Sequence, residues 1–440
     1  MRGIEIYVIV VLAVGIIIGI LCLIYAFRLY RRKRLIDDLP TSKTHGVFIG
    51  VSELSGTAEV KQPLTSFLAE VECVYFSYKV EEHWSRTVTE SYTDSEGRHQ
   101  TRTRTESGWQ VVSRVEKRPP FYLRDDTGVI RINPSGAEIH AKQVFSTYCR
   151  RNNPLYYEKG PARAISDSTH YRRFIEYAIP LQAKLYVIGH AQEREDIVAA
   201  EIVKSKKSPM FLISTHDERH HSRGFKEKFW FWSACGFASS VGTAAICYST
   251  GELSLSLVEM LAPVIAFYLV AFFVAWVLTI YNSMARLRQR VKQASSQIEV
   301  QLKRRYDLIP RIMETVTAYR DYESGLLKTV TEIRSQVELA QEDENLCEIK
   351  GLLPTLLAVA EKYPTLKADD QFLNMQKCLT ETEQRLTLAR DYYNEITTFY
   401  NTRLEIVPDR FLARIFGFKP SSLLSSSGLE RAVVEVDLAS

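Results

Sequence analysis

Three stretches of the chain are long and apolar enough to cross a lipid bilayer, and this feature constrains the fold more than any other. They are Ile6–Phe27, Phe229–Thr250 and Met260–Ile280, and none of them contains a charged side chain. Spanning about 30 Å of hydrocarbon takes roughly 20 helical residues, because a helix satisfies all of its own backbone hydrogen bonds. We therefore expect an integral membrane protein with three transmembrane helices.

The basic residues beside these segments predict how the chain is oriented. Arg28 and residues 31–34 follow the first segment, whereas only Arg2 precedes it. Basic residues also precede the second segment and follow the third, and the link Gly251–Glu259 between them has none. Cytoplasmic flanks collect Lys and Arg, so the N-terminus and this link are expected outside and everything else in the cytoplasm. A cleaved signal peptide is the alternative for the first segment, but its basic residues would precede the apolar run.

Composition narrows the classes of function. The 440 residues are 46% hydrophobic and 25% charged, with a net charge of +4. This small excess lies mostly beside the apolar segments, which favours anionic lipid headgroups over nucleic acid as a partner. The seven cysteines include no CxxC pair, so zinc ligands of the RING type are not predicted. No Walker loop, nucleophile elbow or HExxH is present either, so we assign no catalytic, cofactor-binding or metal-binding residue and expect a non-enzymatic protein.

Residues 35–228 predict a small antiparallel sandwich or barrel. Six segments are rich in Val, Ile, Tyr and Phe, and several alternate apolar with polar residues: Gly46–Glu53, Val71–Glu82, Trp109–Glu116, Phe121–Asn133, Leu185–Ala191 and Met210–Thr215. Asp125 and Asp126 could be paired acids, but a hairpin turn before Gly128 is favoured, because Asp caps its own backbone there. Residues 85–108 are almost all Ser, Thr and charged, and form either a mobile loop or, as we prefer, a long hairpin that turns at Ser95–Gly97.

The order of motifs in this region resembles the GIDE-type domain of mitochondrial membrane-anchored ubiquitin ligases. The motifs are GVFIGVSEL, KQPLTSFLAEVECVY, FYLRDDTGVIRINP, RRFIEYAIPLQAKLYVIGHA and KSPMFLIST. The resemblance implies a β-rich domain between two membrane helices, which fits the expected spans. Ubiquitin transfer in that family depends on a C-terminal zinc-binding RING. Because this sequence has no such ligand set, the resemblance does not carry ligase activity over.

A different pattern begins at Tyr281. Apolar residues recur at steps of mainly three and four, as on the buried face of a helix. No Gly or Pro separates Ile280 from Leu308, so the third membrane segment and this helix should form one continuous rod, which Pro310 should kink. Further helices are expected at about 311–343, 347–362 and 369–404, which together predict a C-terminal antiparallel α-helical bundle continuous with the third membrane helix.

Two motifs in this region resemble the LemA family. They are YNSMARLRQRVKQASSQIEVQLKRRYDLIPRIMETV and ARDYYNEITTFYNTRLEIVPDRFLARIFGFKP, and together they bracket residues 281–420. The resemblance implies a membrane-anchored helical bundle from a family with no established enzymatic activity, although an ordinary member carries one anchor. The matching residues that we single out as a family motif and interaction surface are Gln297, Gln301, Arg304, Arg305, Asp307, Pro310, Tyr392, Tyr393, Asn394, Tyr400, Phe416 and Phe418.

Two charged segments have competing interpretations. His216 and His220 in the segment 216–221 would share one helical face and could bind a metal, but a solvated linker beside the membrane is favoured because Arg219 opposes a cation. The segment 303–307 could be a patch for lipid or an acidic partner. It could equally place Arg305 in an ion pair with a facing helix or in a contact between subunits.

The sequence therefore predicts a membrane α+β protein in five parts: an anchor with a basic flank (1–34), a GIDE-like β-rich domain (35–228), a transmembrane hairpin (229–280), a LemA-like bundle (281–420) and a C-terminal tail (421–440). Our leading hypothesis is a scaffold that assembles with its own copies at the cytoplasmic face of the bacterial inner membrane, in envelope organisation or stress. Expected partners are the lipid bilayer, further copies of the chain and other membrane proteins, with no cofactor and no nucleic acid. The alternatives are a ubiquitin-ligase-like protein or subunit, and an envelope stress sensor that engages a partner through residues 85–108.

Overall fold

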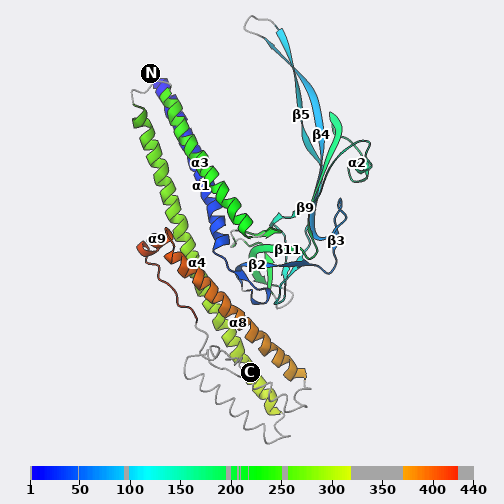
Figure 1. Cartoon of the computed structure of the whole chain (residues 1–440), viewed down its shortest axis with the longest axis vertical. Helices are drawn as coiled ribbons and strands as arrows, with labels where there is room; N and C mark the ends of the chain where they lie inside the picture. The colour runs from blue at the N-terminus through cyan, green and yellow to red at the C-terminus, as the bar shows by residue number, and fades with distance from the viewer. Residues whose placement is uncertain are drawn as a thin grey trace, which may run out of the picture. The chain divides into compact units, whose positions relative to one another are not determined.

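The chain folds into one β-rich and one helical unit (Figure 1). The computed structural model describes residues 2–47, 49–93, 99–194, 200–205, 208, 210–216, 218–249, 256–318 and 370–424. Residues 41–223 make up the β-rich unit, and residues 1–40 with 224–440 make up the helical unit. The α+β class is confirmed. The helix expected at 347–362 and most of the one at 311–343 lie outside the described residues.

Five strands of the β-rich unit close into a ring. The larger sheet has the order β1-β2-β6-β7-β12-β11-β13-β8, and β2 pairs with β11 as well. Its strands are β1 Thr41–Ser42, β2 Gly50–Glu59, β6 Phe121–Arg124, β7 Val129–Ile132, β8 Glu138–His140, β11 Lys184–Glu193, β12 Ala200–Val203 and β13 Leu212–Ser214. The path β2-β6-β7-β12-β11-β2 is therefore a small barrel.

The expectation of a purely antiparallel sheet is wrong at three places. β1 with β2, β7 with β12, and β8 with β13 are parallel pairs. For β7 with β12 the reason is arithmetic, since strands cannot alternate in direction around a closed ring with an odd number of members. At least one neighbouring pair in such a ring must be parallel.

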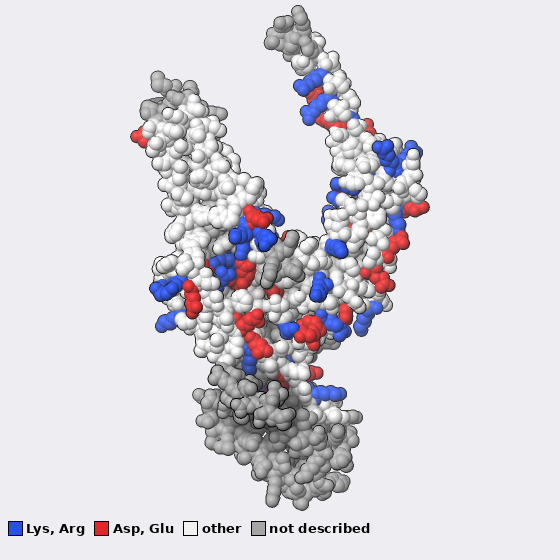
Figure 2. Space-filling view, viewed as in Figure 1, with Lys and Arg blue, Asp and Glu red and all other residues white. Residues whose placement is uncertain are grey.

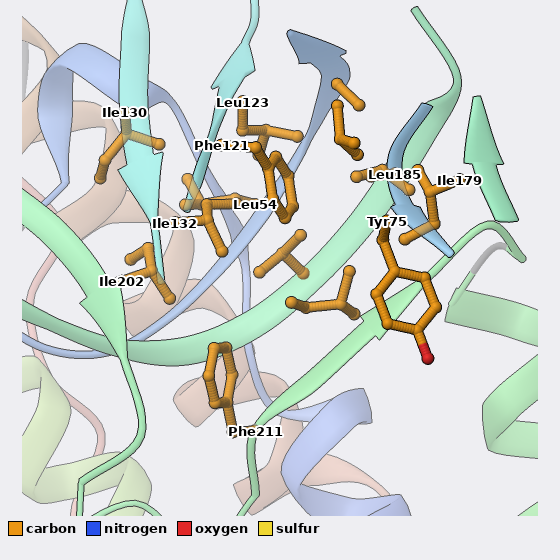
Figure 3. Packing of buried hydrophobic residues seen from close by; sticks show 14 of the residues in the cluster. Leu54, Tyr75, Phe121, Leu123, Ile130, Ile132, Ile179, Leu185, Ile202 and Phe211 are labelled. Carbon is orange, nitrogen blue, oxygen red and sulfur yellow. The ribbon is translucent and has the colours of Figure 1, made fainter. Parts of the chain in front are cut away.

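Alternating side chains fill the barrel. Phe121 and Leu123 of β6, with Ile130 and Ile132 of β7, point inward and are almost fully buried, while the residues between them face outward (Figure 3). The two strands pair up to Arg124 opposite Val129, which confirms the predicted hairpin. This apolar core fixes the register of the strands, because a shift by one residue would turn every inward side chain outward.

A second sheet carries a long projecting hairpin. Its order is β3-β4-β10-β9, with β5 also paired to β4; the bounds are β3 Leu64–Thr65, β4 Glu72–Thr93, β5 His99–Lys117, β9 Lys142–Arg150 and β10 Ser168–Pro180, and the short helix α2 Leu155–Glu158 follows β9. β4 and β5 pair without a break from Ser85 opposite Ser107 to Thr93 opposite His99, so the paired arms of the preferred hairpin are confirmed. The turn expected at Ser95–Gly97 lies outside the described residues. The pairing of β10 with β4 ends at Trp84. Among the described residues, the outer part of the hairpin is a two-stranded ribbon.

Five helices are described in the helical unit: α1 Arg2–Asp37, α3 Glu218–Ser249, α4 Leu257–Ala318, α8 Asp370–Glu405 and α9 Asp409–Ile415. α4 is one helix of 62 residues, so the predicted continuity of the third apolar segment with the rod is confirmed. The same helix continues through Pro310 to Ala318, so the expectation that a separate helix starts at residue 311 is wrong. α8 starts and ends within a residue of the expected helix at 369–404.

Two of these helices are long and apolar enough to cross a membrane. The segments are Val10–Asp37 of α1 and Leu257–Leu308 of α4. Large apolar side chains cover their outer surfaces, with Leu21, Val270 and Phe273 all about three-fifths exposed, and one face of this region is nearly free of charge (Figure 2). An apolar surface of this kind is unusual for a soluble protein, so we describe the chain as membrane-associated. The expected helix α3 is present but is not one of these two, because Ser and Gly interrupt its apolar residues. Among the described residues, the expectation of three membrane helices is therefore supported for two.

Small residues let α1 and α3 approach closely. A Cβ added to Gly15 would lie 2.1 Å from the Thr243 hydroxyl oxygen, and one added to Gly19 would lie 2.2 Å from the Ser240 hydroxyl oxygen. Gly15 and Gly19 form a GxxxG motif within an apolar helix, a pattern that favours close helix packing in membranes. This motif was not among the features predicted from the sequence, and the close packing also explains why α3 is rich in Gly and Ser.

Oxidation should join Cys22 of α1 to a cysteine introduced at Gly236 of α3. A Cβ at position 236 lies 3.0 Å from the Cys22 Cβ, and a disulfide needs roughly 3.5–4.5 Å, so a small shift suffices. In a Cys235→Ser background, Gly236→Cys is expected to crosslink in most molecules, as measured by non-reducing peptide mass spectrometry. Gly242→Cys is the control, since nothing lies within 4 Å of its Cβ. Equal crosslinking of both variants would contradict the packing of α1 on α3.

Candidate functional site

The first LemA-like motif lies on α4 where it packs against α8. Gln301 and Arg305 are buried, Gln297 is half-buried, and Arg304 and Asp307 are exposed. The side chain of Pro310 lies outside the described residues. Gln297, Gln301 and Arg305 are four residues apart, so they share one face of the helix. Arg305 Nε lies 2.7 Å from Glu383 Oε1 of α8, so the ion pair with a facing helix is present.

The second motif holds the segment that follows α9. Asn401 donates from Nδ2 to the Ser421 carbonyl (2.8 Å) and accepts from the Ser421 amide at Oδ1 (3.0 Å). Asn394 binds the carbonyl and amide of Leu424 in the same way, at 3.1 and 2.9 Å. Seven helical residues rise about 10.5 Å, which equals the reach of three extended residues. The spacing of the two asparagines thus matches the spacing of the backbone groups that they bind.

Two tyrosines beside these asparagines bind the same segment, residues 419–424, which we call the latched segment. The Tyr400 hydroxyl donates to the Lys419 carbonyl and the Tyr393 hydroxyl to the Ser422 carbonyl, each at 2.9 Å. Phe418 packs on Tyr281, which directly follows the apolar stretch of α4, with ring centroids 5.7 Å apart. Tyr393, Tyr400 and Phe418 are therefore buried by their own chain, Tyr392 is half-buried, and Phe416 is the exposed member of the aromatic set that we had expected to offer contact surface.

Removing both asparagines should release the latched segment. Asn394→Ala with Asn401→Ala removes four hydrogen bonds at the surface of α8, and we expect the amides of Ser421 and Leu424 to exchange with solvent about tenfold faster, equivalent to ~1.4 kcal/mol. Hydrogen exchange read by mass spectrometry measures this. Asn374→Ala on the exposed face of the same helix should leave the exchange rate unchanged. An unchanged rate in the double variant would contradict the latch.

Charged residues gather where α1 and α4 leave their apolar stretches. Asp38, which follows α1, accepts hydrogen bonds from Ser283 of α4 and from Arg403 Nε of α8 at 2.9 Å. Arg34 of α1 pairs with Asp409 at the start of α9. All of these groups except Arg403 are buried. They tie α1 to α4, α8 and α9 through contacts between parts of the chain that are far apart in sequence.

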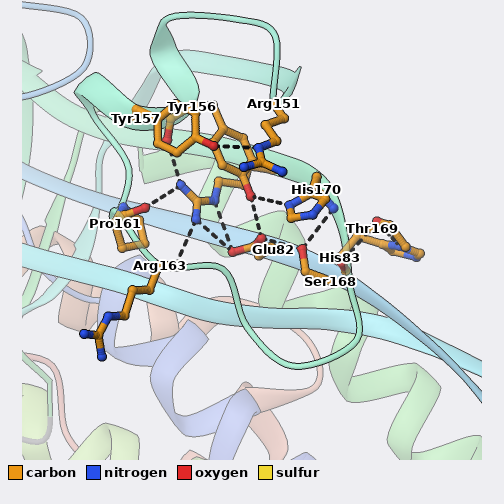
Figure 4. A network of polar contacts seen from close by, with 11 residues as sticks. Glu82, His83, Arg151, Tyr156, Tyr157, Pro161, Arg163, Ser168, Thr169 and His170 are labelled. Carbon is orange, nitrogen blue, oxygen red and sulfur yellow. Dashed lines mark hydrogen bonds and ion pairs between the residues drawn. The ribbon is translucent and has the colours of Figure 1, made fainter.

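The β-rich unit contains a buried ion pair of its own (Figure 4). Arg172 of β10 donates from Nε and Nη2 to Glu82 Oε2 of β4 at 3.1 and 3.0 Å, and neither side chain is exposed to solvent. Glu82 Oε1 accepts from the Tyr156 hydroxyl at 2.7 Å. The Arg172 guanidinium also donates to backbone carbonyls of Tyr156, Pro161 and Arg163. The pair therefore anchors α2 and the following loop to the sheet.

Acid should destabilise the β-rich unit. Burial alone raises the pKa of the Glu82 carboxyl, but the hydrogen bonds that it accepts outweigh burial and hold the pKa below its ordinary value. The stabilisation is fully present above about pH 5 and is lost as the pH falls through the lowered pKa of the folded state. Thermal unfolding between pH 7 and pH 3 should show the loss, and Glu82→Gln should flatten the dependence. An identical slope in both proteins would contradict this assignment.

Two other predicted features of this unit have clear outcomes. Asp125 Oδ1 accepts from the amides of Thr127 (2.8 Å) and Gly128 (3.0 Å), so the turn interpretation is confirmed.

In the segment 216–221, His221 Nε2 lies 2.7 Å from the Ser214 hydroxyl and its ring packs against His140. The side chain of His220 is outside the described residues. Among the residues described, no group of three or more His, Cys, Asp or Glu could hold a metal ion.

The buried thiols of the β-rich unit are poor nucleophiles. Burial, together with the nearby Glu176 carboxylate, raises the pKa of the Cys73 thiol to about 11, and burial also raises the pKa of Cys149. A reactive cysteine needs a lowered pKa and access to solvent. Neither residue meets these conditions.

Comparisons with known proteins match two segments of the chain. Residues 294–438 match the model of the LemA family, and residues 89–245 match the GIDE model, described as E3 Ubiquitin ligase. Protein LemA of Metamycoplasma hominis is 24% identical over 183 residues, which cover 39% of this chain and 83% of that protein. Magnetosome protein MamQ 2 of Paramagnetospirillum magneticum is 25% identical over 186 residues, covering 36% and 68%. Magnetosome protein MamQ of Magnetospirillum gryphiswaldense is 22% identical over 192 residues, covering 37% and 70%.

These matches agree with both resemblances in the sequence. The LemA match begins within α4 and includes α8, α9 and the latched segment, whereas the GIDE match begins within β4 and ends within α3. Each covers about a third of the chain. The chain thus combines a LemA-family segment with a GIDE-family segment.

Proposed function

We propose that the chain is a non-enzymatic scaffold of the bacterial inner membrane that assembles with further copies of itself at the cytoplasmic face. In this proposal α1, α3 and the apolar part of α4 all cross the membrane, with the N-terminus and the link 250–256 outside. The β-rich unit and the α4–α8 pair lie in the cytoplasm. The scaffold serves envelope organisation or the response to envelope stress.

The observation that carries the proposal is the unbroken helix α4. Its apolar part leads directly into the part that packs on α8, and the residues from Leu257 to Ala318 would be about 93 Å long. A continuous helix transmits position and orientation from the membrane to the α4–α8 pair. Asp38 and Arg34 reinforce the connection at the membrane end, because they tie α1 to the same helices.

The size of the particle tests self-assembly. Light scattering on the detergent-solubilised full-length chain is expected to give a mass of several copies, and a strictly monomeric particle would reject the proposal. Gln289 lies on the exposed face of α4, so Gln289→Pro breaks the rod at a cost of ~3 kcal/mol while Gln289→Ala leaves it intact. We expect the proline variant alone to lose the assembly. Assembly that persists in the proline variant would rule out a rigid α4 as its basis.

Labelling from one side of the membrane tests the orientation. Cys378 of α8 is an exposed free thiol, so an impermeant maleimide added to spheroplasts should label it only after lysis. Ser256→Cys, at the exposed end of the link directly before α4, should be labelled in intact spheroplasts. Labelling of Cys378 from outside would overturn the proposed topology.

A second candidate function rests on the GIDE match, whose model is described as E3 Ubiquitin ligase. In this case the chain would be a subunit that recruits a RING-containing partner, since its own sequence lacks the paired cysteines of such a site. Metal analysis of the complex isolated from its native membrane would detect the zinc of that partner. A complex without zinc would leave this candidate unsupported.

A further inference from the structure

A small cavity lies among the charged residues at the membrane end of the helical unit. It is lined by Leu35, Asp38, Ser283, Arg286, Leu287 and Arg290 and is partly open; the empty space in and around it, open solvent included, is about 180 Å³. α1 with the residue after it supplies one wall and α4 the other. The lining combines two guanidinium groups, one carboxylate and one hydroxyl with two buried leucines.

Two guanidinium nitrogens in this region are buried without a hydrogen-bond partner among the described residues. They are Arg286 Nη2 and Arg34 Nη1. A buried donor that is left unsatisfied costs about 1–3 kcal/mol, and more when it is charged. Such a cost is offset when an acceptor occupies the site, so the unpaired donors point to a missing anionic group.

The charges around the cavity favour an anion. Arg31, Arg34 and Arg290 all act on the Arg286 guanidinium, and Asp38 is the carboxylate that offsets them. Asp38 is already bound by Arg403 and Ser283. Asp409 is likewise bound by Arg34. The positive charge of Arg286 therefore lacks a carboxylate of its own.

The height of the cavity agrees with the level of lipid headgroups. Arg286 follows the end of the third apolar segment by six residues and Arg34 follows the first by seven, so they lie roughly 9 and 10.5 Å beyond the hydrocarbon. The headgroup layer adds about 5–8 Å on each side of the hydrocarbon core, and an arginine side chain can span the remainder. α9 begins at the same level through Asp409, and it exposes Phe411 and Ile415 next to Arg410 and Arg414, as helices in a membrane interface do.

We propose that this cavity binds a phosphate group, supplied either by an anionic phospholipid or by a soluble phosphate. The forked guanidinium of Arg286 is the principal donor, since its free Nη2 matches the geometry of phosphate oxygens. Arg34 and Arg290 supply further positive charge, and the Ser283 hydroxyl lies in the same wall. Binding of this group does not depend on self-assembly, so a monomeric chain would retain the site.

Native mass spectrometry of the full-length chain in detergent tests the site. We expect phosphatidylglycerol to be retained at least about tenfold more strongly than phosphatidylcholine with the same acyl chains, and Arg286→Gln to remove about tenfold of that affinity. Lys292→Gln is the matched control, because it removes one positive charge from an exposed position of the same helix, and it should change retention less than twofold. Equal effects of the two variants, or equal retention of the two lipids, would overturn the proposal.

Two further measurements complete the test. Competition with inorganic phosphate identifies the source of the phosphate group, and the variant Arg286→Lys controls for misfolding caused by Arg286→Gln. If inorganic phosphate displaces phosphatidylglycerol from the wild-type chain and binds without lipid, the ligand is a soluble phosphate; if it does neither, the ligand is the lipid. Arg286→Lys keeps the charge but loses the fork, so it should lose two- to threefold of the affinity while eluting like the wild type in gel filtration. Full retention of the lipid by Arg286→Lys together with full retention by Arg286→Gln would exclude Arg286 as the donor.

Discussion

Arg172→Ala is expected to destabilise the β-rich unit by about 3–5 kcal/mol, the range observed when one partner of a buried ion pair is removed. The cost arises because Glu82 would remain fully buried with neither of the hydrogen bonds from Arg172. The carbonyls of Tyr156 and Pro161 would lose their donors as well. For a unit of this size the midpoint of thermal unfolding should fall by about 10 °C or more, as measured by scanning fluorimetry of the full chain.

The neighbouring residue supplies a matched control for Arg172. Arg173 lies on the outer face of the same strand, is partly exposed, and pairs with Glu81 while stacking over Trp109. Arg173→Ala should cost about 1–2 kcal/mol, because water replaces much of what is lost. Replacing both partners, as Arg172→Met with Glu82→Leu, should be less harmful than Arg172→Ala alone. If Arg172→Ala and Arg173→Ala lower the midpoint of thermal unfolding by the same amount, the buried ion pair does not organise the sheet as described.

Asp38→Asn should have the second largest effect, a loss of about 2–4 kcal/mol from the helical unit. The substitution keeps the size of the side chain and removes the charge that Arg403 binds at 2.8–2.9 Å. Arg403 would then depend on Asp409, whose nearest oxygen is 4.0 Å away and which Arg34 already occupies. We expect α8 and α9 to separate from α1 on heating, with faster proteolysis of the segment after Glu405.

Asp37→Asn is the control for this second variant. Asp37 precedes Asp38 in the chain but pairs with Lys33 one turn earlier on α1, at a partly exposed position. Ion pairs of this kind contribute about 0.3–0.5 kcal/mol, so the midpoint of unfolding should barely move. A similar shift in both variants would mean that general loss of negative charge, rather than the contact with Arg403, determines the stability of the region.

The sequence predicted the local elements well because their signals are local. The alternation of Phe121 with Leu123 and of Ile130 with Ile132 predicted two barrel strands, and the turn at Asp125 predicted their hairpin. The uninterrupted run after Ile280 predicted that α4 continues beyond its apolar part, although not that it passes Pro310. The GxxxG motif at Gly15 and the two asparagines seven residues apart were also readable. Their structural roles were not predicted, because each depends on a partner segment elsewhere in the chain.

The polar contacts that organise each unit could not be predicted in this way. Asp38 and Arg403 are 365 residues apart, and Glu82 and Arg172 are 90 residues apart. A single sequence gives no measure of which distant charges meet, since any carboxylate is chemically suited to any arginine. The parallel pairing of β7 with β12 escaped prediction for a related reason, because it follows from closing the ring rather than from the residues of either strand.

The strand order of the barrel bears on how such a chain could have arisen. The first strand, β1, lies beside β2 and the last, β13, lies beside β11, and β2 and β11 are themselves neighbours. The polypeptide thus enters and leaves this module within three strand spacings, roughly 14 Å. A domain whose two ends lie close together can be inserted into a loop of another protein without disrupting the packing of that protein. Replacing residues 41–223 with a short glycine linker should therefore leave a helical protein that still associates with the membrane.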